Sequence, residues 1–153
     1  MTKHWKGLSV ILMSLTCICI ILPRTAVAGN RITADLRIIH AATDSRHMDP
    51  ALRDLGHELQ SVFKYTAYRL LNRKSLTLAY NTVGRINLPG ARRLEISPTG
   101  FKNGRIKFKI NIFKENRTVF GTEILLKNGS SITIGGPGYE NGYLLFNISG
   151  TTK

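Results

Sequence analysis

The clearest alternating pattern in the chain is Arg105-Ile106-Lys107-Phe108-Lys109-Ile110-Asn111-Ile112-Phe113. Up to Ile112, apolar residues occupy every second position, and the residues between them are basic or polar. Because successive side chains of a β-strand point to opposite faces, this alternation predicts a strand with one buried and one solvated face. Strands of this kind are typical of antiparallel sheets.

Three Asn-Gly pairs follow or precede such runs, at Asn103-Gly104, Asn128-Gly129 and Asn141-Gly142. Asn and Gly both tolerate a positive φ, so the pair predicts a tight β-hairpin between two alternating runs. We expect the first pair to join residues 92–101 to 105–113 and the second to join 119–126 to 131–135. The third should join the strand 131–135, across residues 135–138, to 143–148.

Further strands are predicted upstream. Residues 32–42 alternate, and His40 lies on the apolar face together with Ile32, Ala34, Leu36 and Ile38. The other short β-like runs are residues 65–71, 75–80, 85–88 and 92–98.

One helix is predicted between these strands. Asp49-Pro50 is a helix start, since Asp caps free N–H groups and Pro is tolerated at the first helical position. The residues that follow have one apolar face, formed by Leu52, Leu55, Leu59, Val62 and Phe63.

Together these patterns predict an α+β fold: mostly an antiparallel β-sheet or sandwich with β-hairpins, and one amphipathic helix packed on it. The length of 153 residues allows one ordinary domain, and we assign residues 29–153 to it. We also expect the strand at 32–42, the helix and the strand from Tyr65 to form a split βαβ unit.

Residues 1–28 have the pattern of a signal peptide. Lys3 and Lys6 form a basic head, residues 7–22 are an apolar run without charge, and Ala26-Val27-Ala28 has the small residues of a cleavage site. The apolar run is 16 residues long, shorter than the roughly 20 that span a bilayer. We therefore expect export with cleavage after Ala28. The alternative is an inner-membrane anchor formed by residues 7–22.

Without residues 1–28 the chain is basic and free of cysteine. Both cysteines, Cys17 and Cys19, lie in this segment, so the exported domain would have no disulfide or thiolate site. That favours a bacterial periplasm over the eukaryotic exterior, where small domains are often cross-linked. Lys3, Lys6 and Arg24 are three of the 22 basic residues, which leaves 19 against nine acidic ones and a formal charge of +10.

Residues 93–149 contain a recognisable order of motifs. These are Leu94-Glu95-Ile96 followed by Pro98, the alternating strand from Ile106 to Ile112, Leu126-Lys127-Asn128-Gly129, and Ile132-Thr133-Ile134-Gly135-Gly136. The order resembles the β-core of bacterial outer-membrane secretins. Pro137 stands where that family usually has an apolar residue, and the chain is too short for the family's repeated N-terminal domains and lacks its membrane-inserting lip. The resemblance therefore implies a small periplasmic accessory protein rather than a ring-forming channel.

The sequence contains none of the motifs His-Glu-x-x-His, Gly-x-Ser-x-Gly or Gly-x-x-x-x-Gly-Lys-Ser/Thr. Gly135-Gly136-Pro137-Gly138 lies between predicted strands, where a turn is expected, whereas a phosphate-binding loop precedes a helix. We expect no enzymatic activity, no cofactor and no metal. The open alternative is a small metalloprotein or hydrolase that uses His40, His47 and His57, which would have to converge.

The strongest indication of binding is a basic face. Lys102, Arg105, Lys107, Lys109 and Lys114 are predicted to line the solvated face of the hairpin at residues 103–104. Such a face attracts polyanions through long-range potential and counterion release. For an exported protein, lipid headgroups and anionic envelope polymers are the expected anions.

These observations predict an exported, periplasmic or secreted, non-catalytic binding or envelope-assembly accessory domain. Its partner would be an envelope protein that engages an edge strand or the basic face. The alternative function is the binding of anionic envelope polymers or lipid headgroups through that face, with contact at a membrane surface. Nucleic acid is not an expected partner, because aromatic residues are not interleaved along the face for base stacking. The basic face could also be a solvated edge whose lysines prevent edge-to-edge aggregation.

Overall fold

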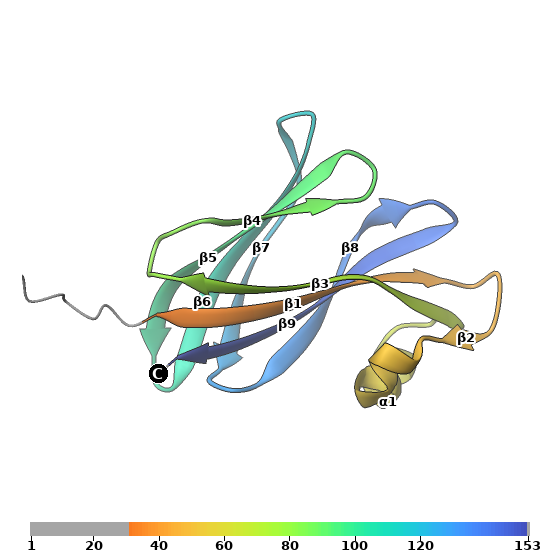
Figure 1. Cartoon of the computed structure of the whole chain (residues 1–153), viewed down its shortest axis with the longest axis horizontal. Coiled ribbons are helices and arrows are strands. Elements are labelled where there is room, and N and C mark those ends of the chain that lie inside the picture. Colours follow the sequence, from red (N-terminus) through yellow and green to blue (C-terminus); the bar gives the residue numbers. More distant parts are fainter. Residues whose placement is uncertain (1–30, 153) are drawn as a thin grey trace, which may run out of the picture.

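The computed structural model describes residues 31–152, which form two β-sheets packed face to face and a short helix (Figure 1). Sheet A has the strand order β2-β3-β1-β9-β8. Its pairings are antiparallel except for the short parallel pairing of β2 with β3. Its strands are β1 (Ile32–Ala42), β2 (His47–Met48), β3 (Ala67–Leu78), β8 (Ser131–Tyr139) and β9 (Gly142–Thr152).

Sheet B is an antiparallel meander in the order β4-β5-β6-β7. Its strands are β4 (Gly84–Leu88), β5 (Arg92–Lys102), β6 (Arg105–Lys114) and β7 (Arg117–Lys127). Residues 105–113 therefore belong to a strand, β6, as predicted. Its inward-facing residues are completely buried: Ile106, Phe108, Ile110 and Ile112.

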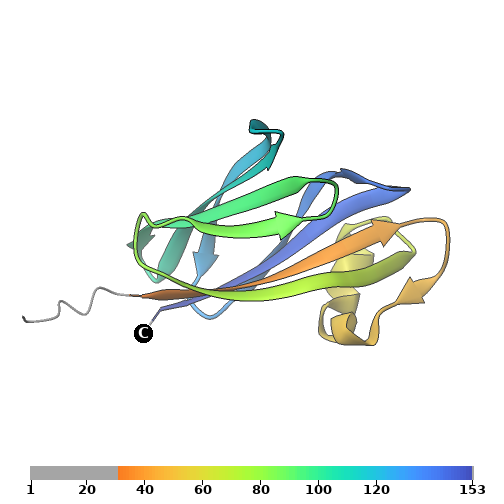
Figure 2. The same cartoon turned by 45° about the horizontal axis from the view of Figure 1, so that its top comes forward.

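The main core lies between the two sheets (Figure 2). Leu36 of β1 and Phe146 of β9 meet Phe108 and Ile110 of β6 in it, and all four are fully buried. Burying an apolar side chain of this size stabilises a fold by about 1.5–3 kcal/mol. The predicted antiparallel sandwich with one helix is confirmed.

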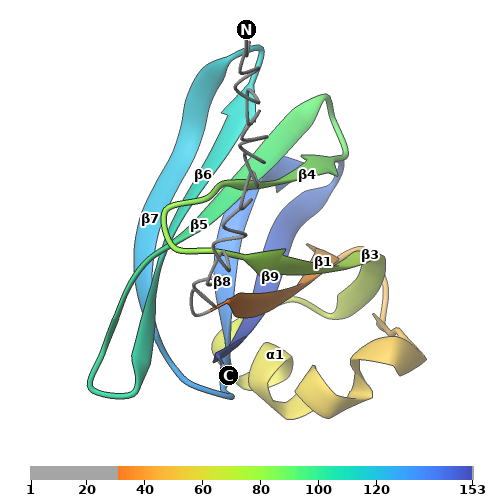
Figure 3. The same ribbon diagram turned by 60° about the vertical axis from the view of Figure 1, so that its left-hand side comes forward.

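A short helical segment covers the face of sheet A that is turned away from sheet B (Figure 3). A turn of 3₁₀ helix, η1 (Pro50–Leu55), runs directly into α1 (Gly56–Val62). The carboxylate of Asp49 accepts a hydrogen bond from the N–H of Ala51 (2.9 Å), which confirms the predicted cap. Its second oxygen accepts a hydrogen bond from the N–H of Leu70 in β3 (3.1 Å), so this side chain also ties the helix to the sheet.

A second apolar cluster holds the helix on sheet A. Leu52, Leu55 and Leu59 face the sheet as predicted and are buried. Val62 was expected on the same face but is exposed, because α1 ends there and Phe63 already has extended backbone. The sheet residues in this cluster include Ile39, Ala41, Tyr68 and Leu145.

The predicted hairpin at Asn128-Gly129 is wrong, because the chain crosses there from sheet B to sheet A. Gly129 does adopt a positive φ of 79°, but the strand that follows pairs with β9 and not with β7. Asn128 accepts a hydrogen bond from the N–H of Thr152 (2.9 Å), and the N–H of Gly129 donates to the carbonyl of Gly150 (2.8 Å). These hydrogen bonds hold the β7–β8 connection against the end of β9.

The other two predicted hairpins form. Asn103 and Gly104, both at positive φ, make a two-residue turn between β5 and β6. The β8–β9 hairpin is also present, but its turn residues are Glu140 and Asn141, while Gly142 already belongs to β9. The turn expected at residues 135–138 is wrong, because they lie within β8, where the pairing with β9 is irregular. A further hairpin, at residues 115–116 between β6 and β7, was not predicted.

Two predictions for the N-terminal half are wrong. The expected split βαβ unit does not form, because β1 and β3 are antiparallel neighbours. Residues 65–71 and 75–80 were expected as separate runs, yet Ala67–Leu78 is one strand. The pairing of this strand with β1 has a bulge between Ile38 and Ile39. At the bulge, the apolar residues of β3 change from one face of the sheet to the other. The predicted signal peptide and its cysteines lie outside the described residues.

Candidate functional site

Three basic side chains form a row across the outer face of sheet B. Residues directly opposite each other on antiparallel strands share a face. Lys102 of β5 lies opposite Arg105 of β6, and Arg105 lies opposite Lys127 of β7. The two-residue turn at Asn103-Gly104 sets this register. We call Lys102, Arg105 and Lys127 the cationic row.

The cationic row has no acidic partner within residues 31–152, where none of its three side chains forms an ion pair. Elsewhere on the same face the charges are compensated. Lys107 pairs with Glu123 (2.7 Å) and holds the pKa of that carboxyl below its ordinary value, and Lys109 lies opposite Glu123. Like charges placed directly opposite each other destabilise a sheet, so we expect the cationic row to lower the stability of the fold.

Lys114 does not belong to this face, which corrects the prediction that five basic residues share it. It follows the buried Ile112 by two residues, so the alternation that exposes Lys107 and Lys109 turns Lys114 to the other face. It also lies at the opposite end of β6, next to the turn into β7.

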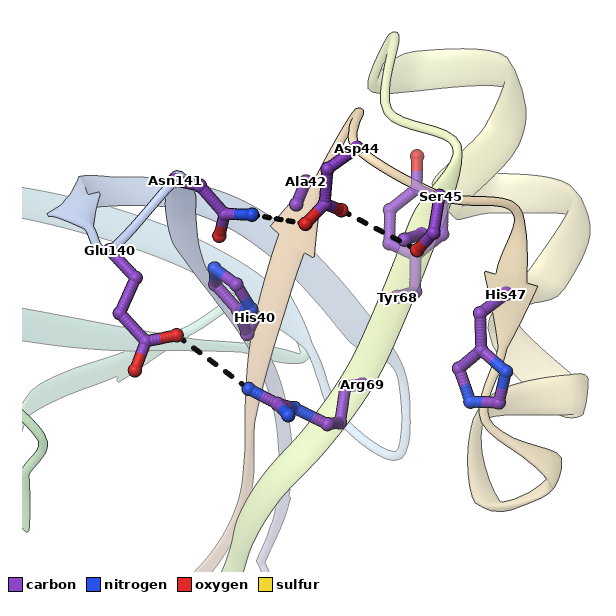
Figure 4. Close-up of a pocket in the computed structure, with 10 residues that line it drawn as sticks. His40, Ala42, Asp44, Ser45, His47, Tyr68, Arg69, Glu140 and Asn141 are labelled. Carbon is purple, nitrogen blue, oxygen red and sulfur yellow. Dashed lines mark hydrogen bonds and ion pairs between the residues drawn. The ribbon is translucent and has the colours of Figure 1, made fainter.

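A second candidate site, which the sequence did not predict, is a pocket of about 280 Å³ at the end of sheet A. It lies between the end of β1, the start of β3, the segment 43–46 and the β8–β9 turn (Figure 4). Its charged and polar lining comes from distant parts of the sequence: His40, Asp44, Ser45, His47, Arg69, Glu140 and Asn141.

Apart from Tyr68, His40 is the most buried polar residue of this pocket. Its side chain follows the predicted apolar face of β1 and is only 7% exposed. The ring packs edge-on against Tyr139, with centroids 5.6 Å apart, and Nε2 is buried without a hydrogen-bond partner among the described residues. A Cβ at position 142 would lie 3.0 Å from this nitrogen and 2.1 Å from the carbonyl oxygen of Ala41, so only glycine fits at Gly142.

Two polar contacts close the rim of the pocket. The amide of Asn141 donates a hydrogen bond to the carboxylate of Asp44, and Arg69 lies 3.7 Å from Glu140 (Figure 4). Glu140 has a φ of 51°, a conformation that costs a non-glycine residue energy. The two contacts therefore connect the β8–β9 turn to the segment 43–46 and to β3.

The three histidines considered as a metal site do not converge. His40 and His47 both line the pocket, but Figure 4 shows the ring of His47 turned away from His40. His57 is exposed on α1 and does not line it. Within residues 31–152, no three His, Cys, Asp or Glu side chains are placed to hold a metal ion. Since Nε2 of His40 has no hydrogen-bond partner among the described residues, no described hydroxyl is hydrogen-bonded to this nitrogen, as a histidine-activated nucleophile would be.

No family model, curated protein or solved structure matches the chain. The resemblance of residues 93–149 to the secretin β-core therefore stays a prediction. In the described part of the chain, no helix has the length and apolar character to cross a bilayer.

Proposed function

We propose that this chain is an exported, non-catalytic binding domain that engages an anionic partner through the outer face of sheet B. One observation carries the proposal. The cationic row aligns three positive side chains that stabilise nothing within residues 31–152. We expect a like-charged alignment without an internal partner to serve an external one. Lys114 and Arg117 also lie opposite each other without an ion pair among the described residues, at the far end of sheet B, and the control variant below tests whether that pair binds instead.

The charge balance supports the same partner class. With residues 1–28 set aside, basic residues outnumber acidic ones by ten, and the row concentrates part of this excess where three strands meet. A concentrated positive field raises the encounter rate with polyanions and binds them with strong salt dependence. The signal-peptide pattern of residues 1–28 supports an envelope location, where anionic polymers and lipids are abundant.

The proposal is tested by binding to a soluble sulfated polysaccharide. A row variant, Lys102→Gln with Arg105→Gln and Lys127→Gln, removes the three charges. We expect the wild-type affinity to fall by roughly tenfold or more between about 50 and 200 mM salt. The row variant should bind weakly at either salt concentration.

A matched control variant removes three exposed cations at the other end of the molecule: Lys64→Gln, Lys114→Gln and Arg117→Gln. It has the same net charge as the row variant and should retain most of the wild-type affinity. Equal losses in the two variants would show that only net charge matters, and would contradict the proposal. If both variants instead bound a protein partner and salt did not weaken that binding, the partner would be expected to dock at an edge strand such as β7 or β8.

A further inference from the structure

We infer that the anionic partner is a lipid surface and that one end of the sandwich rests on it. The inference depends on the proposed function and specifies its partner. The end in question, here called the basic end, contains the cationic row and Arg31, and it is where β1 starts and β9 finishes (Figure 1). The hydrogen bond from the N–H of Asn128 to the carbonyl of Gly104 holds the β5–β6 turn beside the β7–β8 connection.

No acidic residue lies in the segments that form the basic end. These segments are residues 31–34, 79–83, 99–106, 126–134 and 148–152, and none contains Asp or Glu. The nearest carboxylates along the strands are Asp35 and Glu123, and Glu123 is held by Lys107. A layer of anionic headgroups approaching this end would therefore meet positive charge without local repulsion.

Exposed apolar side chains distinguish a lipid surface from a soluble polymer. Among the described residues, four of the seven exposed large hydrophobic side chains lie at or next to the basic end. Leu125, 59% exposed, lies opposite Lys107 on the outer face, and Phe101, 43% exposed, precedes Lys102. Val83 and Ile132 are the other two. A polyanion in water offers these side chains no favourable environment, whereas the boundary between headgroups and acyl chains does.

The connectivity of the chain favours the same occupant. The polypeptide that precedes β1 joins the domain at the basic end, and it contains the apolar run 7–22. Whether that run is an anchor or a leader in transit through a membrane, the basic end is the part of the domain attached to it. Lysine and arginine side chains beside a membrane segment are favoured by anionic lipids.

The experiment measures partition of the protein, as isolated from the producing cells, onto lipid vesicles. One set contains one part phosphatidylglycerol to two parts phosphatidylcholine, and the other contains phosphatidylcholine alone. We expect binding to the first set only, with the row variant weakened by about a hundredfold, since each basic residue near an anionic surface contributes about a fivefold gain. The control variant should lose far less.

Leu125→Ser separates lipid from polymer. It should weaken vesicle binding severalfold and leave polysaccharide binding unchanged, while Val119→Ser, on the exposed other end of β7, should affect neither. Polysaccharide binding without preference for anionic vesicles would overturn the lipid inference and leave the proposed function intact. If the row variant still bound the polysaccharide and the anionic vesicles as tightly as the wild type, both the lipid inference and the proposed function would be overturned.

Discussion

The basic end and the opposite, helix end of the sandwich use their charges differently. At the helix end, Asp49 caps η1 and binds β3, Asp54 pairs with Arg37 (2.7 Å), and Glu140 lies beside Arg69. These charges hold the fold together. At the basic end, the cationic row is bound to nothing within residues 31–152. Charges at the helix end therefore stabilise the fold, whereas the three charges of the cationic row are left for a partner.

The largest expected effect comes from a methyl group added at the helix end. Gly142→Ala would place its Cβ 2.1 Å from the carbonyl oxygen of Ala41 and force β9 away from β1. We expect it to lower the free energy of unfolding by about 3 kcal/mol or more, measured by urea denaturation.

The matched change at the basic end is Gly104→Ala. A Cβ there meets open space, and only the φ of 71° opposes it. We expect a loss of about 1 kcal/mol. If Gly142→Ala were the milder of the two, the close packing of β1 against the β8–β9 turn would be contradicted.

Acid should weaken the helix end first. The hydrogen bond from Arg37 lowers the pKa of Asp54 below its ordinary value of 3.8, and hydrogen bonds from the N–H groups of Ala51 and Leu70 lower that of Asp49. Because both carboxyls bind protons less readily in the folded state, their stabilisation is present above about pH 4 and is lost as the pH falls through the lowered values. Asp54→Asn should cost at most about 1 kcal/mol at neutral pH, since solvent screens this exposed group.

Denaturation at a series of pH values checks this expectation. The Asp54→Asn variant should show a shallower loss of stability below about pH 4 than the wild type. Hydrogen exchange under acid should reveal opening at the amides of Ala51 and Leu70 before the amides of β6. An unchanged acid slope in the variant would contradict the structural role of Asp54.

A smaller effect of opposite sign is expected in the cationic row. Arg105→Glu places a negative charge between Lys102 and Lys127 and turns two repulsive cross-strand pairs into attractive ones. We expect stability to rise by about 0.5 kcal/mol, while polysaccharide binding falls. A variant that loses stability would show that the row is not repulsive, and one that keeps full binding would show that it is not the site.

The smallest effect is expected at the rim of the pocket. Arg69→Ala removes an ion pair of 3.7 Å between two half-exposed side chains. Such pairs contribute little, so the change in thermal stability should correspond to less than about 0.5 kcal/mol. A larger loss would mean that the Arg69–Glu140 contact holds the strained turn in place.

Much of the fold could be predicted from alternation alone. The pattern around Phe108 identifies β6 and its buried face, and Asn103-Gly104 identifies the turn that aligns Lys102 with Arg105. The crossing at Asn128-Gly129 could not be predicted, because a local turn signal does not say which strand comes next in the sheet. That choice depends on hydrogen bonds with β9, more than twenty residues away: Asn128 accepts one from the N–H of Thr152, and the N–H of Gly129 donates one to Gly150.

The candidate sites also differ in how far the sequence alone predicts their residues. Two members of the cationic row flank a hairpin and were found by spacing, whereas Lys127 joins them through strand pairing. The pocket around His40 combines Asp44, Arg69, Glu140 and Asn141, which are brought together by the ends of four strands. No local pattern marks these residues. Lys114 could have been placed correctly from the sequence, because the alternation of β6 already assigns position 114 to the face of Ile112 and not to that of Lys107 and Lys109.

Whether the basic end is the binding surface can be decided by following backbone amide NMR signals while bicelles containing phosphatidylglycerol are added. We predict that shifts and broadening concentrate at residues 102–107 and 125–130 and are reversed by salt. Changes confined to residues 40–47 and 139–142 would show that the pocket, and not the basic end, is the binding surface.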